Sequence, residues 1–403
     1  MGVALQSTAT SVNIKERLDF SCAIFDAEGA LIANAPHIPV HLGSMGESIR
    51  TIIETRGSGA DGRGIRRGDA YVLNDPYRGG TPLPDITVIV PVFYGEENAE
   101  PSAFVAARGH HADIGGIAPG SMPPNSRSIE EEGVLIDNAL LVDEGRFLEI
   151  ETRARLGSGR WPARNVDRNI SDLKAQLAAC VRGAEVLAAT ARDCGSEVIA
   201  PYMRHVLANA EESVRRLLGR LDDGAFDYEM DNGARIRVVI GIDKESRSAT
   251  FDFSGTSAQQ PDNFNAPYSI VRAASLYVVR TLVDDPIPMN DGCLRPIRLV
   301  VPDGCMMRGG TPATAAPRTR ARGVRPLRLA ASSEAMMIAA APSLTPEALP
   351  AVTVPSARTM GLSLASASRV VARGCSSRST ITRSPLRCGI STPTISAASR
   401  PFA

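Results

Sequence analysis

The sequence predicts an α+β fold: a mixed sheet domain with a helical hairpin insertion, followed by a disordered tail. Residues 1–164 contain apolar runs of strand length bounded by turn-forming residues. Residues 165–222 carry apolar side chains at helical spacing, and residues 223–307 change to the alternation typical of strands. Beyond residue 307 neither period is sustained, which places a fourth segment at 308–403.

The mixed α/β domain at 1–164 contains five predicted strands. Each is a short apolar run with Gly, Asp, Asn or Pro close to at least one of its ends, and these residues favour turns. The last strand leads directly into Arg108-Gly109-His110-His111. The predicted strands are 22–25 and 30–32, which flank a turn at 26–29, then 69–73, 86–93 and 103–107.

Residues 165–222 predict two amphipathic helices joined at Cys194-Gly195. Asn169 or Ser171 can cap the first helix, and the short joint predicts an antiparallel hairpin. The β-rich segment that follows predicts a hairpin at 235–254, because apolar residues alternate there. One further strand is predicted at 297–301, between Pro296 and Pro302.

The charge of the chain is unevenly distributed. All 403 residues together have a formal net charge of zero, 43% hydrophobic and 22% charged residues, which gives no field toward nucleic acid or a membrane. Residues 308–403, however, contain 13 Arg, no Lys and two Glu, a net of +11 that leaves −11 for the rest.

The tail at 308–403 consists mainly of Ala, Ser, Thr, Arg and Pro, with Phe402 as its one aromatic residue. Such a composition cannot offset an ordering cost of about 1–2 kcal/mol per residue. We therefore expect disorder, and the abrupt change of composition suggests a reading-frame shift. A natural basic tail that binds nucleic acid is the alternative, although its Arg residues are dispersed.

Several classes of protein are excluded by missing patterns. No apolar stretch approaches the roughly 18–20 residues that span a bilayer, and the first residues lack the pattern of a secretory signal, which predicts a cytoplasmic protein. The seven cysteines form no CxxC pair, as expected for reduced thiols. No GxxxxGK[ST] motif is present, so the chain itself shows no site for ATP.

Asn74 to Asp85 is the first segment that could carry chemistry. Its Gly79-Gly80 pair allows backbone conformations closed to other residues and lets a ligand approach the main chain. Asp75 and Asp85 flank the pair at a strand exit and a strand entry. A long surface turn with two turn-forming aspartates is the alternative.

The second segment, Arg108 to Gly116, holds two adjacent histidines followed by Asp113. Imidazole and carboxylate are common ligands of divalent transition metals, and either can act as a general base. If the strand continues, His111 and Asp113 share a face; if it turns at Gly109, His110 and Asp113 can converge. His41 could reach such a site or be a hydrogen-bonded core residue.

The third segment, Asp252 to Ser257, follows a strand and carries Ser254 and Thr256. Small hydroxyl residues at this place predict either a loop that contacts substrate or an ordinary turn.

Together these segments resemble the hydantoinase B/oxoprolinase family, to which the B-type subunits of N-methylhydantoinase-type enzymes belong. The similarity runs in order through nearly all of residues 1–307. The matching stretches are Asn13–Ser21, His37–Met45, Asn74–Asp85, His110–Gly116, Phe251–Ser257 and Asn290–Cys293.

The resemblance implies the B-type subunit of an ATP-dependent hydrolase of small cyclic amides such as hydantoin or 5-oxoproline. An A-type partner would bind ATP and activate the ring carbonyl, and this chain would support attack by water within a hetero-oligomer. A divalent metal, Mn, Zn or Fe, fits this chemistry because it lowers the pKa of bound water. The implied catalytic residues are His110, Asp113 and Asp75; the substrate contacts are Arg78, Gly79, Gly80, Thr81, Ser254 and Thr256; the metal ligands are Asp85, His110, His111, Asp113 and His41.

The sequence departs from the family pattern at two places. The pattern has His-x-x-Asp in both loops, but the first loop here is Pro82-Leu83-Pro84-Asp85, which predicts weak or absent metal binding. The tail also lacks the later family motifs. A non-catalytic remnant that binds the A-type partner and a subunit of a related ketone carboxylase are therefore alternatives. A stand-alone metal amidohydrolase would need more ligands than five scattered histidines provide.

Overall fold

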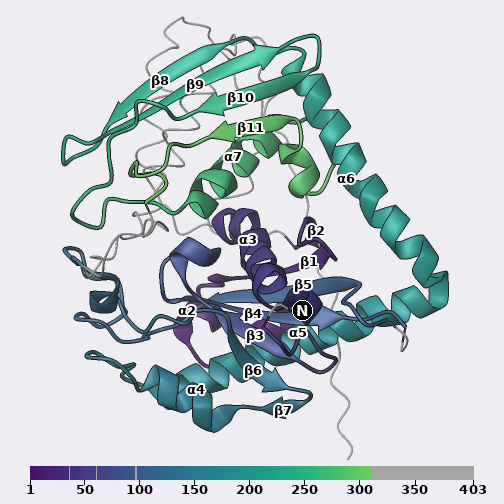
Figure 1. The fold of residues 1–403 in the computed structure, drawn as a ribbon, viewed down its shortest axis with the longest axis vertical. Coiled ribbons are helices and arrows are strands. Elements are labelled where there is room, and N and C mark those ends of the chain that lie inside the picture. Colours follow the sequence, from purple (N-terminus) through teal and green to yellow (C-terminus); the bar gives the residue numbers. More distant parts are fainter. Residues whose placement is uncertain (36, 60, 96–97, 310–403) are drawn as a thin grey trace, which may run out of the picture. The chain divides into compact units, whose positions relative to one another are not determined.

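The computed structural model describes residues 1–35, 37–59, 61–95 and 98–309, which form the helices and sheets of Figure 1. The α+β class predicted from the sequence is confirmed. The prediction of a disordered or frame-shifted tail falls almost wholly on residues 310–403, which lie outside the described residues. None of the helices in the described part is long and apolar enough to cross a membrane.

Within the described residues the first sheet has seven strands in the order β2-β1-β5-β4-β3-β6-β7, and all neighbours are antiparallel. All five strands predicted in 1–164 are present. β4 begins one residue earlier than predicted, at Asp85, and β5 continues beyond its predicted end to His110. The bounds are β1 Phe20–Asp26, β2 Leu31–Asn34, β3 Ala70–Leu73, β4 Asp85–Val92, β5 Ala103–His110, β6 Ala139–Asp143 and β7 Arg146–Phe147.

The second sheet of the described residues has the order β11-β10-β9-β8, with β10 and β11 parallel. Its β9–β10 pair is the predicted hairpin, and β11 is the predicted last strand. The bounds are β8 Gly224–Glu229, β9 Arg235–Asp243, β10 Ser248–Asp252 and β11 Ile297–Val300.

Helices cover both sheets. The predicted cap of α5 was wrong, because the helix begins earlier and the Asn165 side chain accepts a hydrogen bond from the amide of Arg168. α5 packs on β4 and β5, whereas α6 packs on α7, η4 and β10, so the two helices join different parts of the fold. The bounds are α1 Gly2–Thr8, α2 Val12–Lys15, α3 Pro39–Arg56, η1 Gly57–Gly59, η2 Pro76–Arg78, η3 Ile129–Glu131, α4 Glu149–Leu156, α5 Val166–Cys194, α6 Ser196–Leu218, α7 Tyr268–Leu282 and η4 Asp291–Leu294.

The two faces of the first sheet carry different side chains. Because successive residues of a strand point to opposite faces, Ile86 and Val88 of β4 belong to the apolar cluster beneath α5. Asp85 and Thr87 point to the other face, where α3 lies. The face beneath α3 is therefore apolar along most of its length but polar where β4 begins and β5 ends.

α3 is held in place by α7. A Cβ atom at Gly43 would lie 2.4 Å from the Cα of Ala273, so only glycine allows the two backbones to approach this closely. The opposite side of α3 carries His41, Ser44 and Ser48 at helical spacing, and these three side chains face the polar end of the sheet.

Candidate active site

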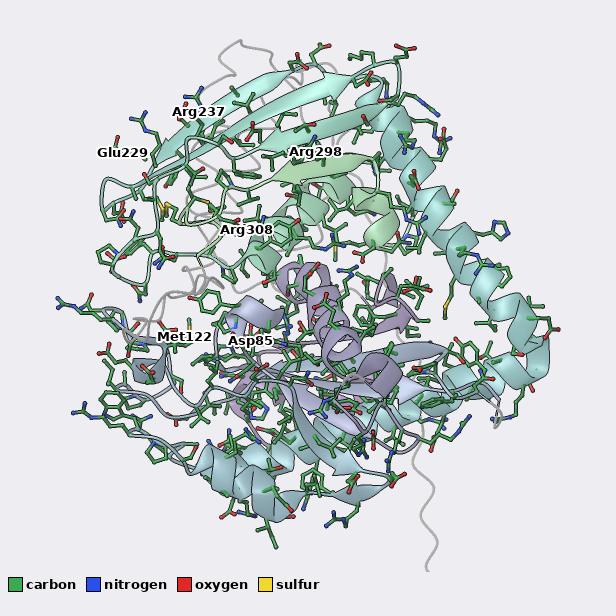
Figure 2. All side chains as sticks on the ribbon, in the orientation of Figure 1. Asp85, Met122, Glu229, Arg237, Arg298 and Arg308 are labelled. Carbon is green, nitrogen blue, oxygen red and sulfur yellow. The ribbon has the colours of Figure 1, made fainter. Side chains whose placement is uncertain are left out.

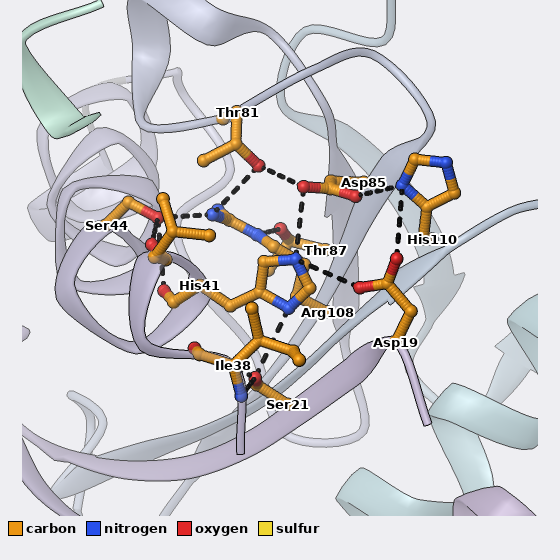
Figure 3. A network of polar contacts seen from close by, with 12 residues as sticks. Asp19, Ser21, Ile38, His41, Ser44, Thr81, Asp85, Thr87, Arg108 and His110 are labelled. Carbon is orange, nitrogen blue, oxygen red and sulfur yellow. Dashed lines mark hydrogen bonds and ion pairs between the residues drawn. The ribbon is translucent and has the colours of Figure 1, made fainter. Parts of the chain in front are cut away.

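Asp85 and His110 form the centre of the site. They are directly opposite each other in the β4–β5 pair, and the Nδ1 of His110 lies 2.7 Å from the Oδ1 of Asp85 (Figure 3). Asp85 is almost completely buried, at 1% exposure, whereas the His110 side chain is 19% exposed. The pair therefore joins the interior of the sheet to its surface.

The other carboxylate oxygen of Asp85 has two further partners. The Nε2 of His41, on α3, lies 3.1 Å from Oδ2, and the hydroxyl of Thr81 donates to Oδ2 at 2.6 Å. On its far side, the Nδ1 of His41 lies 3.2 Å from the hydroxyl of Ser21. The predicted metal ligands Asp85, His110 and His41 are thus brought together.

Asp19 completes this cluster and was not among the predicted site residues. Its carboxylate oxygens lie 3.8 Å from the Nε2 of His41 and 3.9 Å from the Nδ1 of His110, and its side chain is 37% exposed. The preceding Leu18 has a positive φ of 58°, which is unfavourable for a branched side chain and is often found at functional sites.

The pKa values of Asp85 and His110 are shifted in opposite directions. Burial by itself raises the pKa of Asp85, but the attraction of His41 and hydrogen bonds from His110 and His41 outweigh it and hold the pKa well below the usual range. Burial lowers the pKa of His110, yet the hydrogen bond and charge of Asp85, with the charge of Asp19, raise it above the ordinary value of 6.5. The pKa of Asp19 is raised by burial and by repulsion from Asp85.

His111 and Asp113 have other partners. Since β5 continues through His110, His111 points to the opposite face, where its Nε2 lies 2.9 Å from Gln176 and its Nδ1 lies 3.1 Å from the amide of Asn169. Asp113 accepts hydrogen bonds from Arg164 at 2.7 Å and from two glycine amides. Asp113 therefore pairs with neither His111 nor His110, and both predicted arrangements were wrong. His110 pairs instead with Asp85 on the neighbouring strand.

The two adjacent histidines should titrate in opposite directions. Burial lowers the pKa of His111, although Asp172 and Gln176 oppose the shift, whereas the pKa of His110 is raised. His110 thus stabilises the fold below pH ~6.5, and this contribution is lost as the pH rises through its folded pKa. The neutral form of His111 contributes stability above pH ~6.5 that is lost as the pH falls.

Histidine NMR titration of chelator-treated protein should show this difference, with His110→Asn and His111→Asn used for assignment. Two histidines that titrate together near pH ~6.5 would contradict it.

The loop from Asn74 to Thr81 is held by its own contacts. Asp75 caps η2 by accepting a hydrogen bond from the amide of Tyr77, and Arg78 forms an ion pair with Asp137 at 3.0 Å. A Cβ at Gly79 would lie 2.2 Å from the amide nitrogen of Ser48, and one at Gly80 would lie 2.4 Å from the carbonyl oxygen of Asn74. The two glycines are thus required by packing against the protein's own backbone.

Ser254 and Thr256 lie with the second sheet. The Thr256 hydroxyl donates to the carbonyl of Arg237 at 3.0 Å and accepts from its amide, and the Ser254 amide donates to Asp252. Arg237 and Asp85 are labelled on the two different sheets in Figure 2. The structure therefore places these predicted substrate contacts on a turn of the second sheet.

The donor chemistry of the cluster fits a divalent metal. Two imidazoles and two carboxylates, from His41, His110, Asp85 and Asp19, meet within 3.9 Å, and such groups are typical ligands of Zn, Mn and Fe. Their atoms are at hydrogen-bond distances from one another, and the described residues contain no group of three or more His, Cys, Asp or Glu whose geometry could hold a metal ion as it stands. Pro82, whose carbonyl accepts from the amide of Asp85 at 2.9 Å, offers no side-chain donor.

Comparison with known proteins identifies the relatives of this fold and site. The family model for hydantoinase B/oxoprolinase matches residues 1–360. The chain belongs to this family. The 5-oxoprolinase PfmaA of Pestalotiopsis fici is 47% identical over 319 residues, which cover 76% of the chain and 24% of that relative. The chain thus spans about a quarter of the length of this relative.

Two solved structures share the fold of this family member. The ATP-dependent caprolactamase of Pseudomonas jessenii superposes with a TM-score of 0.72 at 23% identity, over 86% of this chain and 58% of that one. A nucleotide-free acetone carboxylase gives a TM-score of 0.67 at 18% identity, over 76% and 42%. At these identities the likeness establishes the fold alone.

Proposed function

We propose that the chain is the B-type part of an ATP-dependent hydrolase of cyclic amides, which opens a ring carbonyl activated by an A-type, ATP-binding partner. The observation that carries the proposal is the buried Asp85 carboxylate, which bonds a partly exposed histidine at the surface end of two central strands. Family membership and the resemblance to a 5-oxoprolinase support the substrate class.

The chain's own residues can move a proton. Because the Nδ1–H of His110 is donated to ionised Asp85, the Nε2 of neutral His110 has a lone pair that can accept a proton from water. Asp85 fixes the ring and stabilises the imidazolium that forms, as the carboxylate of a catalytic triad does. Asp19, the more exposed carboxylate, lies beside both histidines and adds negative charge there.

Asp19, His41, Asp85 and His110 are the residues that would hold a divalent metal. Such an ion, when bound, polarises an oxygen atom and lowers the pKa of water.

The test is an assay of ATP-dependent opening of hydantoin and 5-oxoproline by the full chain with an A-type subunit added. Turnover that needs ATP, the partner and His110 supports the proposal. No turnover with intact partner binding selects the alternative, a non-catalytic remnant. ATP-dependent carboxylation of a ketone without ring opening selects the carboxylase alternative.

Pro82→His should increase metal binding. Pro82 begins the turn that ends at Asp85, so an imidazole there adds a donor beside the cluster. We expect weak or absent metal in the unchanged protein and about one ion per chain in the variant. Elemental analysis of both proteins after dialysis against Zn²⁺ or Mn²⁺ measures this. Equal metal content would refute the prediction, and His110→Ala in the variant should remove the gain.

A further inference from the structure

Arg108 is a wholly buried cation on the same face of β5 as His110. Its guanidinium donates to hydroxyl groups and one carbonyl, all of them neutral. The contacts are Nε to Thr87 at 2.7 Å, Nη1 to Ser44 at 2.5 Å and Thr81 at 3.4 Å, and Nη2 to Ser48 and to the carbonyl of Gly79, both at 2.8 Å.

A buried charge that bonds only neutral groups is costly, and an apolar side chain would fill the same space at less expense in desolvation. An arginine guanidinium has five N–H donors and stays protonated in proteins, so Arg108 is a cation here. Its charge must therefore be compensated from a short distance, and Asp85 is the carboxylate to which its contacts lead.

Thr81 connects the two charges in a defined direction. Arginine has only donors, so the Thr81 hydroxyl accepts from Arg108 and must give its single proton to Asp85, at 2.6 Å. The same guanidinium holds the carbonyl of Gly79, two residues earlier, against α3. Arg108 thus controls both the loop that carries Thr81 and the hydrogen bond that Thr81 gives.

We propose that Arg108 is a positioning residue: through Thr81 it orients the Asp85 carboxylate toward His41 and His110 and fixes the loop at Gly79 beside them. The role in catalysis rests on the proposed function. The orientation of Asp85 does not, because it can be observed without turnover.

The experiment compares four single variants of the full chain, and the Thr81→Val/Arg108→Met double variant, with a matched control. Thr81→Val replaces the hydroxyl with a methyl group of similar size, and Thr81→Ser keeps the hydroxyl. Arg108→Met removes the cation, and Arg108→Lys keeps the charge. The control is Thr51→Val, because the Thr51 hydroxyl also joins α3 to this loop, at the carbonyl of Arg78, but has no contact with Asp85.

Two readouts are required. The first is the NMR signal of the His110 Nδ1–H proton, which lies far downfield when donated to a well-oriented carboxylate, measured in chelator-treated protein. The second is kcat and KM with the A-type partner. We expect Thr81→Val and Arg108→Met each to shift the signal and lower kcat roughly 10–100-fold with KM within about twofold, since partners of a reactive carboxylate have effects of this size.

Thr81→Ser should restore both readouts, Arg108→Lys should restore part, and the double variant should lose less than the sum because the two residues act in one chain. Thr51→Val should change neither. An unchanged His110 signal in folded Thr81→Val overturns the inference, as does an equal effect of Thr51→Val. A signal that shifts as expected in a protein without turnover supports the positioning role and counts against the proposed function alone.

Discussion

Asp85→Asn should lower kcat/KM roughly 100- to 1,000-fold and destabilise the fold by about 3–5 kcal/mol. The first figure is the usual loss of a group that stabilises developing charge, and the second is the usual effect of breaking a buried charge pair. The neutral amide would place a donor where His41, His110 and Thr81 all offer hydrogen bonds to an acceptor. Denaturant unfolding and steady-state kinetics with the A-type partner measure both effects.

Asp69→Asn is the matched control. Asp69 is also buried and paired, with Arg63 at 2.6 Å, and its pKa is lowered by that hydrogen bond against the effect of burial. Both aspartates stabilise the fold above pH ~3.9, and the stability is lost as the pH falls through their folded pKa values. Each variant lacks one of these carboxylates, so its free energy of unfolding should fall less steeply with decreasing pH than that of the unchanged protein. Comparable losses of activity in the two variants would show that Asp85 acts only through stability.

Gly79→Ala should destabilise the protein by about 2–5 kcal/mol, measured by urea unfolding. The residue has a positive φ of 91°, which costs about 1–2 kcal/mol with a side chain, and its Cβ would lie 2.2 Å from the backbone of Ser48. Such overpacking adds about 1–3 kcal/mol, because backbone atoms cannot move aside. The displaced loop should also lower activity, since it carries Thr81.

Gly145→Ala separates the two causes. Its φ of 93° matches that of Gly79, but a Cβ there would meet no atom within 4 Å. Its cost should stay near the ~1–2 kcal/mol of the backbone conformation alone. Equal losses in the two variants would mean that the contact with α3 contributes nothing.

The strands that carry the centre of the site could be predicted, because apolar runs at 86–93 and 103–107 are bounded by turn residues. The antiparallel register that places Asp85 opposite His110 comes from the structure, because the two runs alone do not fix which residues face each other. Alternation along β5 also decides between the two histidines, since only one of them can lie on the face of Asp85.

Other parts of the site have no local signal. α3, which carries His41, holds several glycine and serine residues whose place in a helix depends on packing against α7. Arg108 lies in an otherwise apolar strand, where a charged residue suggests the end of burial, yet it is wholly buried because hydroxyls from three segments surround it. Asp19 depends on the unusual backbone of Leu18, which a sequence does not reveal.

The close approach of Gly43 to Ala273 makes the chemistry of the early residues depend on a much later helix. A fragment that ends before residue 268 would retain every side chain around Asp85, yet the support that keeps His41 in place would be missing. The length of chain needed for the site is therefore set by a helix that contributes no reactive group. Any shortened version of the protein should therefore retain α7, Tyr268–Leu282.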